Sequence, residues 1–142
     1  MSRLVIVFST DPVRGRIIQK VLMRSRVEAL VLETIEQVRE AISRQAPGVA
    51  IFDTAGCFKG EINHLGNLCG TLAQTAVILV GDGAVLERFE ASATEKELRL
   101  SNPLDPELIA EKVGTLLSLK VEEKPSEDGS LEKDLKGFLG LR

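Results

Sequence analysis

The residues best suited to chemistry stand directly after short apolar runs of the sequence. They include carboxylates, hydroxyls and an amide, with one glycine and one proline among them: Ser9, Thr10, Asp11, Asp53, Gly81, Asp82, Asn102 and Pro103. Carboxylates and neutral oxygen atoms bind hard cations such as Mg²⁺, and a carboxylate is also a nucleophile. The set therefore allows a cation site, and a plain structural role for each residue is the alternative.

The apolar runs that precede these residues have the composition of buried β-strands. They occupy residues 4–8, 27–32, 49–52, 76–80 and 98–100, and apolar residues at helical spacing follow each run. This alternation predicts an α/β fold with a parallel sheet covered on both faces. Right-handed crossovers make it a doubly wound five-stranded sheet in the order 2-1-3-4-5, whose ligand edge lies at the carboxyl ends of the strands.

The composition changes after this domain, which we place at residues 1–120. Residues 121–130 have the acidic, proline- and glycine-containing composition of a linker. Residues 131–142 are predicted to form a short amphipathic tail helix with four apolar side chains on one face: Leu131, Leu135, Phe138 and Leu139. The tail either folds back as an extra helix, binds a groove of a partner, or begins a further domain. Gly137 and Gly140 weaken the helix, so it needs a surface to dock against.

Residues 3–119 resemble the receiver domain of two-component response regulators, a CheY-like and flavodoxin-like fold. The resemblance rests on Asp53 after the third strand, on Pro103 after the fifth, and on the order of the elements. It implies that Asp53 holds the phosphoacceptor position. The other positions of the family's site fall on residues of a different kind: the acidic metal-binding pair on Ser9 and Thr10, the hydroxyl on Gly81, the lysine on Asn102 and the aromatic switch on Arg99.

These departures predict a degenerate, pseudo-receiver type of site. Phosphoryl transfer depends on neutralising charge with a metal and cations, and each charge at ~4 Å is worth roughly 1–4 kcal/mol. Losing the metal and the lysine should cost several decades in rate, at ~1.4 kcal/mol per decade. We therefore expect no cofactor, no Mg²⁺ binding and no enzymatic activity, and a module that signals through protein–protein contacts. The alternative is a phospho-accepting switch modified at Asp53 with unusual metal ligands.

Several of these residues also have a plain structural interpretation. Asp11 precedes Pro12, which favours a helix cap over a displaced metal ligand. Asp53 is either an active acceptor or, as we favour, an inherited carboxylate hydrated at the edge of the sheet. Lys59 could act as a substitute cation, although a solvated loop lysine is the simpler interpretation. His64, the only histidine, is expected on the surface or in packing.

The expected partners are proteins: a kinase, an effector domain, a polar or motility scaffold, or a second copy of the chain. In the family that the chain resembles, the usual contact face would fall on Leu86, Arg88, Arg99 and Ile109. The first predicted helix is basic and carries no acid, which indicates a solvated face or a surface that docks an acidic partner. Its basic residues and those just after it are Arg14, Arg16, Lys20, Arg24 and Arg26.

The composition argues against several other classes of protein. A formal net charge of −3 gives no attraction to nucleic acid, and no apolar run approaches the ~20 residues of a membrane span. Cys57 and Cys69 are not arranged as a disulfide scaffold or metal site, which favours a reduced, cytoplasmic and bacterial protein. A flavodoxin-like nucleotide or flavin binder remains as a third hypothesis. It is disfavoured by Asp11–Pro12 after the first strand and by the absence of Trp and Tyr.

Overall fold

The structure, a computed structural model, describes residues 3–89 and 96–122. In chain order its elements are β1 (Val5–Ser9), α1 (Pro12–Arg24), β2 (Ala29–Leu32), α2 (Ile35–Arg44), β3 (Val49–Asp53), α3 (Lys59–Cys69), β4 (Ala76–Gly81), α4 (Gly83–Leu86), β5 (Glu97–Ser101) and α5 (Pro106–Glu122). The five strands pair in parallel, in the order β2-β1-β3-β4-β5. The predicted fold class and strand order are therefore confirmed.

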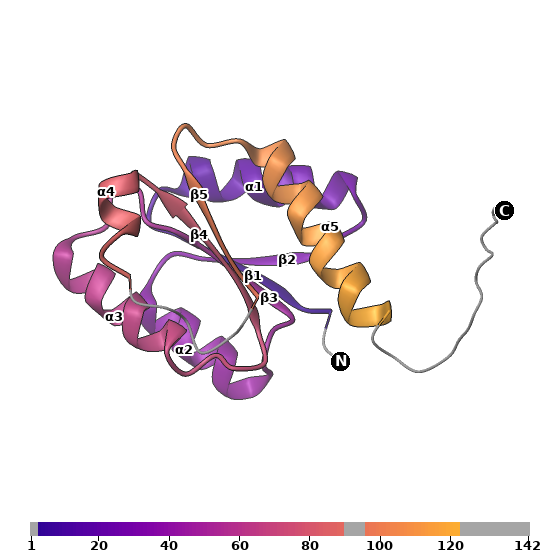
Figure 1. The fold of residues 1–142 in the computed structure, drawn as a ribbon, viewed down its shortest axis with the longest axis horizontal. Helices are drawn as coiled ribbons and strands as arrows, with labels where there is room; N and C mark the ends of the chain where they lie inside the picture. The colour runs from indigo at the N-terminus through magenta and orange to yellow at the C-terminus, as the bar shows by residue number, and fades with distance from the viewer. Residues whose placement is uncertain (1–2, 90–95, 123–142) are drawn as a thin grey trace, which may run out of the picture.

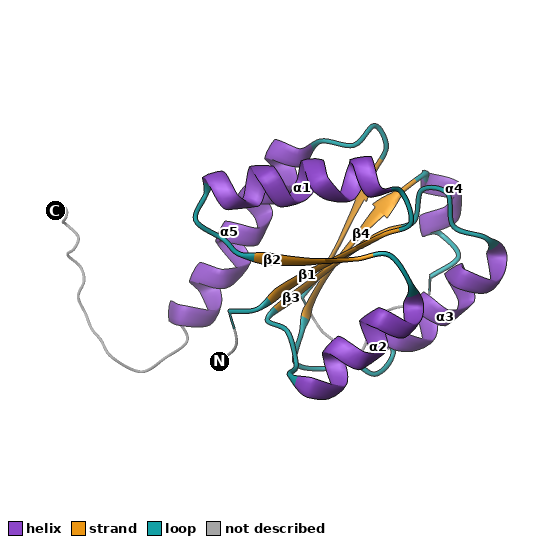
Figure 2. Ribbon diagram, turned by 180° about the vertical axis from the view of Figure 1, so that it is seen from behind, coloured by secondary structure: helices purple, strands orange, loops and turns teal. Residues whose placement is uncertain are grey.

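Helices cover both faces of the sheet, as the alternation of elements requires. Figures 1 and 2 show α1 and α5 on one face and α2, α3 and α4 on the other. Successive side chains of β1 enter the two layers in turn: Val5 and Val7 pack with α1 and α5, whereas Ile6 and Phe8 pack with α2 and α3. Because both faces are buried, β1, β3 and β4 are apolar along most of their length.

The helix starts follow the capping residues that the sequence contains. The Asp11 carboxylate accepts hydrogen bonds from the backbone N–H of Val13 at 2.9 Å and of Arg14 at 3.4 Å. Thr34 and Gln37 form a reciprocal capping box at the start of α2. Each cap satisfies backbone donors that have no partner within the helix, so the first turn begins at a defined residue.

Several element boundaries differ from the expectation, four of them in ways that depend on turns, caps or helix length. β2 begins at Ala29 rather than at residue 27, because residues 25–27 form a turn that closes α1. α3 begins at Lys59, within a stretch at residues 56–60 whose flanking glycines favour a loop, because the Glu61 carboxylate accepts from the Phe58 N–H and caps the first turn. β5 is longer than residues 98–100, and α5 continues to Glu122, two residues into the predicted linker.

The remainder of the predicted linker and the tail helix at 131–142 lie outside the described residues. Across residues 3–89 and 96–122, no helix is both long and apolar enough to span a membrane.

Candidate functional site

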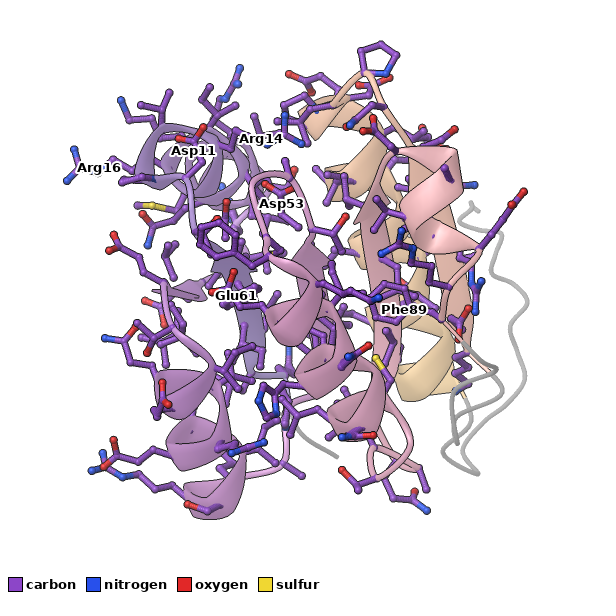
Figure 3. All side chains as sticks on the ribbon, turned by 90° about the vertical axis from the view of Figure 1, so that its left-hand side faces the viewer. Asp11, Arg14, Arg16, Asp53, Glu61 and Phe89 are labelled. Atoms are coloured by element: carbon purple, nitrogen blue, oxygen red, sulfur yellow. The ribbon has the colours of Figure 1, made fainter. Side chains whose placement is uncertain are left out.

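The candidate site lies where the carboxyl ends of the central strands meet. Ser9, the last residue of β1, is level with Asp53, the last residue of β3, and Gly81 of β4 is level with Ser101 of β5. Asp11 and Arg14 approach the same edge from the start of α1 (Figure 3). The fold thus gathers the polar residues at one edge, as predicted, and adds an arginine to them.

The carboxylate of Asp53 is completely buried and has a donor on each oxygen. Arg14 donates from Nε to Oδ2 at 2.7 Å and from Nη2 to Oδ1 at 3.0 Å. The Ser9 hydroxyl donates to Oδ2 at 2.9 Å, and the Ala55 N–H donates to Oδ1 at 3.2 Å. The expectation of a carboxylate hydrated at the sheet edge is therefore wrong, because the Arg14 guanidinium covers it.

The bidentate contact makes Arg14 the cation of this site. Its pKa is raised above the ordinary value, chiefly by the hydrogen bond to Asp53; partial burial opposes the rise, and the charges of Asp53, Asp11 and Asp82 reinforce it. Parallel N–H···O bonds to a carboxylate fix geometry as well as charge. The side chain is 22 % exposed while that of Asp53 is 0 % exposed, so the arginine closes the pocket from the solvent side.

Asn102 extends the ion pair to a second carboxylate. Its Oδ1 accepts from Arg14 Nη2 at 3.4 Å, and its Nδ2 donates to Asp82 Oδ1 at 2.8 Å. An amide can accept on one side and donate on the other, so it links the cation to the acid. A lysine at position 102 would offer donors only and would stand beside the guanidinium. Asn102 is thus the residue type that this pocket, with its internal arginine, accommodates.

The space beside Gly81 is filled by Thr54. A Cβ atom built on Gly81 would lie 1.9 Å from Thr54 Oγ1 and 3.3 Å from Thr54 Cβ. The buried Thr54 hydroxyl donates to the Val80 carbonyl at 2.8 Å. The pocket therefore retains a hydroxyl, but on the residue after Asp53 rather than at the end of β4, and that hydroxyl is engaged with the backbone.

The remaining candidate residues have structural partners. Asp11 caps α1, as predicted, and the Thr10 hydroxyl donates to the Ala55 carbonyl at 3.2 Å. Lys59 is exposed at the start of α3, and the cation that reaches Asp53 is Arg14 instead. His64 is also exposed, with its Nδ1 lying 3.2 Å from Arg39 Nη2. Pro103 follows Asn102 through a cis peptide bond.

The predicted contact face is wrong in two of its four members. Leu86 is 5 % exposed and Ile109 is 1 % exposed, because each packs into one of the two core layers. Arg99 contacts Glu97 and donates to the carbonyls of Leu86 at 2.8 Å and Phe89 at 2.9 Å. Arg99, at the switch position, thus links β5 by hydrogen bonds to the segment that ends α4. The fourth member, Arg88, is exposed.

Cys57 lies behind the site and should be a slow nucleophile. Burial raises its pKa to about 12, with further contributions from Glu61 and Asp53, while a hydrogen bond with Thr10 opposes the rise. Because the thiolate is the reactive form, alkylation by iodoacetamide at about pH 8 should be at least about a hundredfold slower in the folded chain than in urea. Equal rates, measured by peptide mass spectrometry at Cys57, would contradict this placement.

Sequence reasoning missed two residues of the site, Arg14 and Thr54. In sequence Arg14 is one member of the basic face of α1, but the first turn of that helix starts at the edge of the sheet where Asp53 ends β3. A buried acid with Ser9, Thr10 and Asn102 around it requires a cation, and of the nearby basic residues Arg14 is the one in that first turn. The need of a buried carboxylate for a cation was the feature of the sequence that could have identified Arg14.

Comparison with known proteins gives a fold but no sequence family. No protein-family model matches the chain, and no curated protein is significantly similar to it. A CheY-like response regulator receiver domain protein from Methanospirillum hungatei JF-1 superposes with a TM-score of 0.70 at 18 % identity, covering 87 % of this chain and 100 % of that one. A signal receiver domain from Bermanella marisrubri superposes with a TM-score of 0.68 at 16 % identity, covering 82 % of this chain and 99 % of that one.

A third similar structure is described as a putative pilus assembly-related protein from Burkholderia pseudomallei K96243. Its TM-score is 0.63 at 15 % identity, covering 81 % of this chain and 89 % of that one. Identities this low bear on the fold alone. Together with the strand order and the position of Asp53, they show that the chain has the fold of a response-regulator receiver domain.

Proposed function

We propose that the chain is a pseudo-receiver: a non-enzymatic, cytoplasmic signalling module that acts through protein–protein interaction and not through phosphorylation of Asp53. The observation that carries the proposal is the bidentate contact of Arg14 with both oxygens of Asp53. An internal guanidinium occupies the carboxylate that, in the family the fold resembles, would meet the metal and the phosphoryl group.

The donor set argues against a bound Mg²⁺ ion. Mg²⁺ takes oxygen ligands in near-ideal octahedral geometry and needs carboxylates to offset its dehydration. Here Asp53 is paired with the Arg14 guanidinium, and the Ser9 hydroxyl donates to the same carboxylate. The Asp11 carboxylate accepts the backbone hydrogen bonds that cap α1. Within the described residues, no group of three or more His, Cys, Asp or Glu side chains could hold a metal.

The same contacts disfavour Asp53 as a nucleophile. Attack on phosphorus uses a lone pair of a carboxylate oxygen, and each oxygen already accepts from Arg14 and from a second donor. Reaction would first require the guanidinium to leave, which breaks two charge-assisted hydrogen bonds and leaves a buried charge without its partner. The phospho-accepting alternative therefore needs a large rearrangement before chemistry begins.

Such a module signals by binding a protein partner. Kinases, effector domains and polar or motility scaffolds are the classes we propose, with a homodimer as a further form. Arg88 remains exposed at the end of α4 and is available for contact, whereas Arg99 is partly engaged within the domain.

The proposal is tested by incubating the full chain with acetyl phosphate and Mg²⁺ and measuring the intact mass. We expect no phosphoryl adduct on the wild-type chain. Asp53→Asn provides the matched control for modification at any other site. A stable adduct on the wild-type chain that is missing in Asp53→Asn would contradict the proposal and establish the phospho-accepting alternative.

A further inference from the structure

The surface along β2, the edge strand of the sheet, carries three adjoining hollows. The first is lined by Arg3, Met23, Arg26, Val27, Glu28 and Leu117. The second shares Met23 and Glu28 with the first and reaches Leu4 and Leu30. The third shares Leu4 and Leu30 with the second and continues to α2. We call this continuous surface, with Met23, Leu4 and Leu30 at its floor and Arg3 and Arg26 at its rim, the β2-edge groove.

The floor of the β2-edge groove is apolar and open. Met23 is 59 % exposed and Leu30 is 46 % exposed, and both belong to the small set of large apolar side chains that the described part of the chain exposes. Leu30 stands on β2, which has a neighbour on one side only in the sheet. An edge strand with an exposed leucine favours association, and proteins commonly cover such edges. We therefore expect a protein segment to cover the β2-edge groove.

The C-terminal helix α5 contributes a residue to the lining of this groove. Leu117 of α5 lines the first hollow, and α5 ends at Glu122. Figures 1 and 2 show α5 ending on the same side of the domain as the start of β1. The sequence continues for 20 residues past Glu122, to residue 142. Because an extended chain spans up to ~3.5 Å per residue, residues 123–130 can reach as far as about 28 Å from the end of α5.

The chemistry of the continuing sequence matches that of the surface. Its first part has three acids, at positions 123, 127 and 128, against one base, Lys124, whereas the rim near α5 has two arginines, Arg3 and Arg26, against one acid, Glu28. Its second part places Leu131, Leu135, Phe138 and Leu139 on one helical face. An apolar face of this kind needs a docking surface to be stable, because a dozen residues with two glycines are too few for an isolated helix.

We propose that residues 131–142 bind in the β2-edge groove of their own chain, with residues 123–130 crossing the Arg3–Arg26 rim. The apolar face of the segment covers Met23 and Leu30, and the acids of the linker lie against the rim arginines. In this arrangement the C-terminal segment protects the open edge of the sheet. A partner that recognises either the segment or β2 must first separate them, and this holds whether or not Asp53 is ever modified.

The test uses the full chain labelled with ¹³C at the methionine methyl groups. Met1 and Met23 are the only methionines, so the Met23 resonance reports directly on the groove. Leu135→Asp combined with Phe138→Asp should shift the Met23 methyl resonance and raise deuterium uptake in β2 at least severalfold. Lys133→Ser, on the opposite helical face of the segment, is the matched control and should change neither.

A reciprocal substitution separates the groove from the rest of the surface. Leu30→Asp should raise deuterium uptake in residues 131–142, whereas Val13→Asp, at an exposed apolar residue of α1 away from the groove, should leave it unchanged. An identical Met23 resonance in wild type and in the double variant would overturn the proposal. A Met23 shift that grows with protein concentration would overturn it too, because the occupant would then be a second copy.

Discussion

Replacing Arg14 by alanine is expected to destabilise the domain by about 3 kcal/mol, at the lower end of the ~3–5 kcal/mol for breaking a buried ion pair. The large effect arises because the carboxylate of Asp53, which is 0 % exposed, loses its cation and two of its hydrogen bonds. The lower end applies because the shortened side chain admits water to the pocket. Urea unfolding of the full chain, followed by circular dichroism, measures the change.

The companion substitution Asp53→Asn should cost less, about 1–2 kcal/mol, because the partly exposed Arg14 guanidinium can turn toward water. The double variant Arg14→Ala, Asp53→Asn should be more stable than Arg14→Ala alone, since it removes the uncompensated charge. The coupling energy of the cycle reports the pair itself. If Asp53→Asn proved the more harmful single substitution, or if Arg14→Ala were neutral, the ion pair would not be the feature that organises this pocket.

Gly81→Ala is the second substitution with a large expected effect, a loss of about 3 kcal/mol, at the upper end of the ~1–3 kcal/mol for overpacking. The new methyl group would stand 1.9 Å from Thr54 Oγ1. To make room, the Thr54 hydroxyl must leave its hydrogen bond to the Val80 carbonyl, and both groups are buried. Thermal and urea unfolding of the variant measure the loss.

Two controls isolate the contact between Gly81 and Thr54. Gly83→Ala, two residues further along, has no atom within 4 Å of the added methyl group and should change stability by less than about 0.5 kcal/mol. Thr54→Ala in the Gly81→Ala background removes the clashing oxygen and should restore part of the lost stability, with the Thr54 Cβ still 3.3 Å away. Additive effects of the two substitutions would contradict the account of this contact.

Most of the fold could be predicted from the sequence because its signals are local and repeated. The strands β1, β3 and β4 are continuous apolar runs, and α1, α2 and α5 begin at the capping residues Asp11, Thr34 and Asp105. The parallel order then follows from the handedness of the crossovers. The boundaries that were missed depend on contacts beyond the run itself, such as the Glu61 carboxylate that starts α3 inside a loop-like sequence.

The candidate site could be predicted only in part, because two of its decisive contacts join residues far apart in sequence. The position of Asp53 follows from the end of β3, but its partner Arg14 lies 39 residues earlier and looks, in sequence, like one member of a basic helix face. Thr54 is next to Asp53, yet only the packing of β3 against β4 places its hydroxyl where a side chain at position 81 would stand.

The contact face was predicted by analogy and was wrong at Leu86 and Ile109 for a simple reason. Both residues occupy contact positions in the pattern of the family that the chain resembles, but in this chain both are large apolar side chains buried in the core. A hydrophobic residue on a short helix or on the inner stripe of α5 is more often packed than displayed. Exposure has to be decided by the faces that the neighbouring elements cover.

The central claim is that the ion pair with Arg14 prevents Asp53 from binding a metal or accepting a phosphoryl group. A ¹⁵N NMR titration of the full chain with Mg²⁺ and then with beryllofluoride tests it most directly. The Ala55 amide is the probe, because it donates to Asp53 Oδ1 at 3.2 Å. We predict that its resonance stays in place through millimolar additions of both reagents. A saturable shift of the Ala55 amide, accompanied by release of the Arg14 Nε–H from its hydrogen bond, would contradict the account.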